Sequence, residues 1–225
     1  MYRKSTLLCV TQGTAIPNPK AGTDTFDSDD VILSEKGLDQ ARNLRSALSQ
    51  VLTLSGLPLD FIMCSRLSAS RQTAMIGTGR DPTTEQQALS NHSPIKTNAL
   101  YVQRQDPSSL QLIHDAFGEI RAQGEDLRFV DYMTGGVHST NSISAQNLKV
   151  LGHWAECAWV DILHTLLRDP DRRTGLLIGY PCLLQAMLLA ASPAHPVLYD
   201  TVPAPCTGFI ISLEGCTVKR IDRFS

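Results

Sequence analysis

Short runs of consecutive apolar residues alternate along this sequence with segments whose apolar residues recur at helical spacing. The segments at residues 7–10, 60–64 and 175–179 have the length of strands, and their continuous apolar residues 7–10, 61–64 and 176–178 are typical of strands that are buried on both faces. Between the first two runs, residues 38, 41, 44 and 48 are apolar at a spacing that places them on one side of a helix. Strands that alternate with helices predict a three-layer α/β/α sandwich around a mostly parallel central sheet.

Local signals indicate where the predicted helices begin and end. Ser34 has a side chain suited to capping a helix that starts at Glu35, and Gly56 followed by Pro58 ends this helix. A second helix is predicted to follow a turn at Ser65 and to continue to about residue 78. Residues 11–30, which are rich in Pro, Gly, Thr and Asp, are predicted to be a loop. The remaining predicted elements are a strand at 98–102, helices at 107–117, 143–167 and 183–189, and a pair of strands at 207–213 and 218–221.

The length of the chain favours one domain. With 225 residues, of which 42% are hydrophobic, the chain can bury a single sizeable core, so we expect one domain over residues 1–225. Two polar stretches without periodicity, at about 79–93 and 124–141, are predicted to be irregular inserts. The second insert contains Tyr132 and Met133, which we expect either to cover the sheet as a lid or to contact a partner.

Composition argues against several classes of protein. A net charge of −2 predicts neither a nucleic-acid surface nor an anionic-membrane surface. The six cysteines contain no C-x-x-C spacing, so no metal site is expected. Cys9, Cys64 and Cys206 lie in apolar surroundings that predict buried, reduced thiols. Because no apolar run has the length of a signal segment or a membrane span, we expect an intracellular, cytoplasmic protein.

Ligands of open parallel sheets bind where the strands end and the loops begin. The first predicted strand ends at residues 11–13, the second at Ser65 and Arg66, and the third at residues 179–181. These three strand ends are therefore the predicted position of a functional site. Gly13 and Gly179 are equally consistent with a purely structural role in tight turns.

Several motifs together resemble the histidine phosphatase superfamily, whose fold is phosphoglycerate mutase-like. The first strand of that superfamily ends in Arg-His-Gly, where this chain has Thr11-Gln12-Gly13. The motif Leu-Thr-x-x-Gly-x-x-Gln-Ala resembles residues 33–41, and Ser-x-Leu-x-Arg-Ala-x-Gln-Thr-Ala resembles residues 65–74. Further likenesses lie at 176–186, which corresponds to the strand carrying the second family histidine, and at 205–207. The resemblance covers about 1–76 and 174–225.

This resemblance implies phosphoryl transfer through a phosphohistidine, but the residues for that chemistry are replaced. The nucleophilic histidine corresponds to Gln12, whose carboxamide is not a useful nucleophile. The two phosphate-binding arginines correspond to Thr11 and Ala69, and the second histidine corresponds to Tyr180. We therefore predict that Thr11, Gln12, Gly13, Ala69 and Tyr180 form a vestigial phosphate pocket in which no catalytic residue is retained.

Three other polar residues are candidates for this pocket. Arg66 lies at a strand end and is close enough in sequence to position 69 to reach the pocket. His138 lies in the glycine-rich insert, where an exposed loop histidine is the simpler interpretation. Cys182 follows Tyr180 at a predicted helix start, where a thiolate would be stabilised.

The sequence leaves several functions open. One hypothesis is a catalytically inactive pseudophosphatase that acts as a protein-binding or structural subunit and needs no cofactor. A second hypothesis is a repurposed small-molecule binder, or a non-phosphatase enzyme, that uses the same cleft. A phosphatase with unorthodox catalytic residues is the third. Nothing in the sequence identifies a partner. Whether the chain is an enzyme also stays open, and the replaced residues favour an inactive protein.

Overall fold

The computed structural model describes residues 3–19, 31–56, 58–64, 67–80, 173–179 and 203–225, together with individual residues between 156 and 192. The predicted strand at 98–102, the helix at 107–117 and almost all of the two inserts lie outside these residues. Within the described part, no helix is long and apolar enough to cross a membrane. The same residues contain no cluster of His, Cys, Asp and Glu suited to a metal ion.

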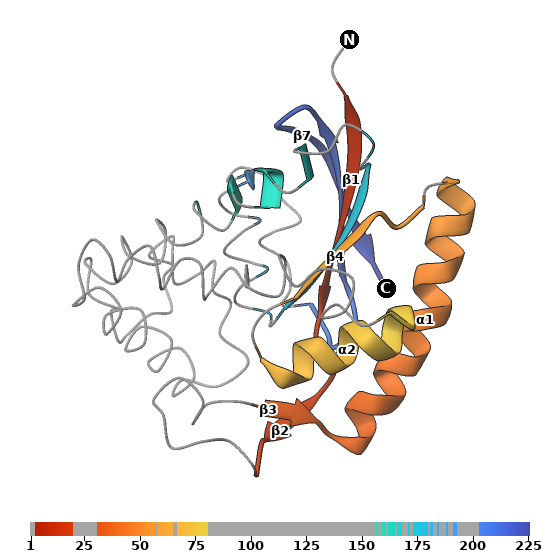
Figure 1. The fold of residues 1–225 in the computed structure, drawn as a ribbon, viewed down its shortest axis with the longest axis vertical. Coiled ribbons are helices and arrows are strands. Elements are labelled where there is room, and N and C mark those ends of the chain that lie inside the picture. Colours follow the sequence, from red (N-terminus) through yellow and green to blue (C-terminus); the bar gives the residue numbers. More distant parts are fainter. Residues whose placement is uncertain are drawn as a thin grey trace, which may run out of the picture.

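A five-stranded sheet forms the centre of the molecule, in the order β4-β5-β1-β6-β7 (Figure 1). Its strands are β1 (Lys4–Thr11), β4 (Phe61–Cys64), β5 (Thr174–Gly179), β6 (Gly208–Glu214) and β7 (Thr217–Phe224). β1 pairs in parallel with β5, and β5 in parallel with β4, whereas β6 is antiparallel to both β1 and β7. Four of these five strands therefore run in the same direction, which confirms a mostly parallel sheet.

Two helices cover one face of this sheet. α1 (Glu35–Ser55) begins as predicted, because the side chain of Ser34 accepts a hydrogen bond from Gly37 N. It ends at Gly56, whose φ of 63° is a left-handed conformation that glycine adopts without strain. α2 (Ser68–Thr78) follows β4 and packs against α1. The core under these helices joins Leu8 and Val10 of β1 to Ala41, Leu44 and Leu48 of α1.

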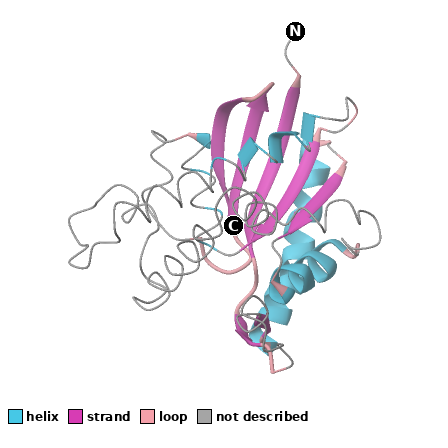
Figure 2. Ribbon diagram, turned by 60° about the vertical axis from the view of Figure 1, so that its left-hand side comes forward, coloured by secondary structure: helices cyan, strands magenta, loops and turns pink. Residues whose placement is uncertain are grey.

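The opposite face of the sheet is covered as well. All six residues of β5 are buried, which requires packing on both sides of the strand. The described helical residues between 156 and 191 lie on the side away from α1 and α2, and Ile162, Leu166, Leu184 and Leu188 are fully buried (Figures 1 and 2). Helices on both faces of a central sheet confirm the α/β sandwich expected from the sequence.

A small two-stranded sheet lies where the sequence predicts only loop. Residues 11–30 are rich in Pro, Gly, Thr and Asp, yet β2 (Ala15–Pro17) pairs antiparallel with β3 (Val31–Leu33). The loop prediction is therefore wrong at residues 15–17. Strands of three residues are too short to show an alternating pattern, so pairing with a distant segment decides their conformation.

Candidate functional site

The carboxyl ends of β1 and β5 lie side by side. Thr11, the last residue of β1, pairs with Gly179, the last residue of β5, and Gln12 N donates a hydrogen bond of 2.8 Å to Gly179 O. Gly179 directly precedes Tyr180 in the sequence. The structure therefore brings together two of the three strand ends that the sequence predicts to form the site. Tyr180, Arg66, His138 and Cys182 themselves lie outside the described residues, so their place in the site stays a prediction.

Thr11 forms hydrogen bonds with the turn that precedes β6. Its side chain is fully buried, and its hydroxyl lies 2.5 Å from Ala204 O and 3.0 Å from Thr207 O. Its main chain continues the contact, because Thr11 N donates to Thr207 O and Cys206 N donates to Thr11 O. The position that corresponds to a phosphate-binding arginine thus holds a neutral side chain whose polar group is used inside the protein.

Replacing Thr11 by valine tests this contact. The change keeps the shape of the side chain and removes the hydroxyl, and we expect the free energy of unfolding to fall by about 1 kcal/mol. The loss is small because Ala204 O still accepts from Thr207 N at 3.1 Å and from Thr207 Oγ1 at 2.8 Å. Urea unfolding measures the change, with the exposed Thr53→Val in α1 as a matched control. Equal losses in the two variants would show that the Thr11 hydroxyl contributes no stability.

Gln12 is held by a residue of α2. The hydroxyl of Ser70 donates a hydrogen bond of 2.6 Å to Oε1 of Gln12. Ser70 is fully buried, whereas Gln12 is half-buried at the edge of the sheet. The carboxamide is therefore fixed in orientation through its oxygen. Sequence reasoning missed Ser70, because nothing at position 70 indicates that the start of α2 faces the end of β1.

Ala69 contributes no polar group to the site. It is fully buried and belongs to the apolar core that also contains Val10 and Ala41. Arg71, two residues further along α2, is exposed and does not belong to this core. Among the described residues that the sequence places in the pocket, none carries a positive charge.

Gly13 packs main chain against main chain at the start of α1. Gly13 N donates to Thr73 Oγ1 at 3.1 Å, and Thr73 Oγ1 in turn donates to Ala69 O at 2.7 Å. A Cβ atom on Gly13 would lie 2.8 Å from Gly37 O, which is closer than a Cβ atom can approach. Glycine is thus required at position 13 because the main chain of Gly37 lies too close for a side chain. The loop after Gln12 is therefore held against α1 and α2.

Two glutamines of the recognised motifs brace the same region. Oε1 of Gln40 accepts a hydrogen bond of 2.9 Å from Thr14 N, and Oε1 of Gln72 accepts one of 2.8 Å from Leu33 N. The sequence motifs contain both glutamines but do not indicate what they do. In the structure they satisfy main-chain donors in the segments next to the site, and so help to fix these segments in place.

Solved structures of other proteins share this architecture. A mycobacterial glucosyl-3-phosphoglycerate phosphatase, solved with VO3, matches with a TM-score of 0.53 at 15% identity, over 98% of this chain and 98% of that one. A phosphoserine phosphatase from Entamoeba histolytica, solved with 3-phosphoglyceric acid, matches with a TM-score of 0.52 at 12% identity, over 98% and 96%. The protein named mycobacterial hydrolase 1 matches with a TM-score of 0.55 at 14% identity, over 99% and 98%. The chain has the histidine phosphatase fold.

Comparisons of the sequence alone find no relative. No protein-family model matches it, and no curated protein matches it either. The histidine phosphatase fold is therefore established by structural similarity. At these levels of sequence identity, the similarity shows the fold and says nothing about function. The chemistry of the chain has to be inferred from its own residues.

Two cysteines near this end of the sheet are unreactive. Burial raises the pKa of the Cys9 thiol far above its usual range, and burial raises the pKa of Cys206 to about 12. Both thiols stay protonated at neutral pH, and a thiol is a much weaker nucleophile than a thiolate. Cys64 is buried as well, so the expectation of buried cysteines is confirmed for all three.

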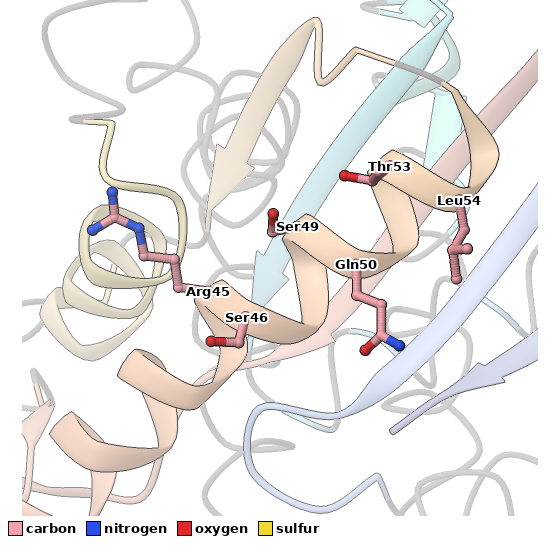
Figure 3. Close-up of a pocket in the computed structure, with 6 residues that line it drawn as sticks. All are labelled: Arg45, Ser46, Ser49, Gln50, Thr53 and Leu54. Atoms are coloured by element: carbon pink, nitrogen blue, oxygen red, sulfur yellow. The ribbon is translucent and has the colours of Figure 1, made fainter.

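A surface depression lies elsewhere, on the outer side of α1. Its volume is about 590 Å³, and its residues come only from that helix (Figure 3). They are Arg45, Ser46, Ser49, Gln50, Thr53 and Leu54. All six side chains are exposed, and none belongs to the predicted pocket. This depression is therefore an exposed surface of α1, separate from the ends of β1 and β5.

Proposed function

We propose that this chain is a catalytically inactive protein of the histidine phosphatase fold, a pseudophosphatase that acts as a protein-binding or structural subunit. The observation that carries the proposal is the environment of Gln12. At the position that corresponds to the nucleophilic histidine, a carboxamide accepts a hydrogen bond from Ser70. An amide nitrogen is conjugated with its carbonyl group, so it does not attack phosphorus as imidazole does.

The charge of the site supports the same conclusion. Phosphate is held by charge-assisted hydrogen bonds, usually from arginine. Thr11 and Ala69 replace both arginines of the motif, and each side chain is fully buried, one against main-chain carbonyls and the other in the apolar core. Loss of a nucleophile together with charge-stabilising donors lowers a rate by many orders of magnitude, because such groups act as a unit.

The hydrogen-bonded framework beside the site favours a role that depends on shape. Gly13, Gln40 and Gln72 make contacts that fix the loops beside the site, although the residues for phosphoryl transfer are replaced. A rigid scaffold without the chemistry is what a binding platform requires. On sequence grounds we place the partner contact at residues 124–141, and we assign the protein to the cytoplasm.

Activity measurements test the proposal. Purified protein is expected to hydrolyse para-nitrophenyl phosphate, phosphoserine and 3-phosphoglycerate no faster than buffer, and to form no acid-labile phosphoenzyme. It is also expected to show no thermal stabilisation by vanadate below the millimolar range, because ligand stabilisation follows occupancy of the native state. A phosphoserine phosphatase of the same fold, assayed in parallel, provides the positive control. Turnover that disappears in Gln12→Ala would refute the proposal.

A repurposed cleft is the second candidate, and one observation favours it. Gln12 is half-buried and not fully enclosed, so a ligand can reach it. A polar group at the carboxyl ends of parallel strands is a reasonable element of a small-molecule site. Saturable binding of a small neutral compound at Gln12, without any protein partner, would favour this candidate over the platform.

A further inference from the structure

We draw no further inference here: the strongest candidate, the depression of about 590 Å³ on the outer side of α1 between Arg45 and Leu54, is lined by the exposed surface of a single helix, and nothing in the described part of the structure shows what covers it.

Discussion

Alanine at position 37 is expected to lower the free energy of unfolding by about 3 kcal/mol, as overpacking at a rigid contact does. A Cβ atom on Gly37 would lie only 2.1 Å from Thr14 O and 3.1 Å from Leu33 Cδ2. Thr14 cannot retreat freely, because its carbonyl accepts from Ser34 N at 2.9 Å and from Ser34 Oγ at 3.0 Å. The clash outweighs the gain of at most about 1 kcal/mol that alanine brings to a helix. Urea unfolding measures the difference.

Gly56→Ala is the matched control for this prediction. Gly56 has a φ of 63°, and a Cβ atom there would meet nothing within 4 Å. Its replacement therefore costs only the left-handed conformation, about 1 kcal/mol. If Gly37→Ala costs no more than Gly56→Ala, the main chain at Thr14 can move. The main chain next to Gln12 would then be more mobile than its hydrogen bonds indicate.

The second large effect is expected at Gly175, inside the sheet. Gly175 pairs directly with Phe61 on the neighbouring strand, and a Cβ atom at 175 would lie 2.2 Å from Cζ of the ring. Phe61 is fully buried, so its ring has no free space to enter. We expect Gly175→Ala to lower the free energy of unfolding by about 3 kcal/mol.

A double-mutant cycle shows whether the ring causes this loss. Phe61→Leu alone is expected to cost about 1–2 kcal/mol through lost burial, but it removes the atoms that the new methyl group meets. The double variant Gly175→Ala, Phe61→Leu should therefore be more stable than the sum of the single losses predicts, by at least about 1 kcal/mol. Additive losses would mean that the main chain of β5 is strained instead.

The sequence allowed most of this fold to be predicted because its core elements are locally patterned. Continuous apolar runs mark β1, β4 and β5, since these strands are buried on both faces, and Ser34 and Gly56 mark the ends of α1. The β2–β3 pair escaped prediction for the opposite reason. Its three-residue strands are stabilised by each other across more than ten intervening residues, and no local property of either segment indicates this pairing.

The site could be predicted in position but not in its contacts. The order of motifs placed Gln12 at the strand end beside the end of β5, and the structure agrees. Thr11 was expected in a vestigial phosphate pocket, and the sequence did not indicate that its hydroxyl is bound to the turn at 204–207. The roles of Thr11 and Ser70 depend on segments that are 193 and 58 residues away, so tertiary structure alone reveals them.

The strand order also has a consequence for the synthesis of this protein. β1 is made first, but both of its neighbours, β5 and β6, come from the last quarter of the chain. During translation the apolar residues of β1 therefore stay unpaired while the more than 160 residues between β1 and β5 are made. A nascent chain of this kind exposes a strand edge during that time, and such edges promote aggregation. Ribosome-associated chaperones are thus expected to matter more for this protein than for one whose first strand pairs with the second.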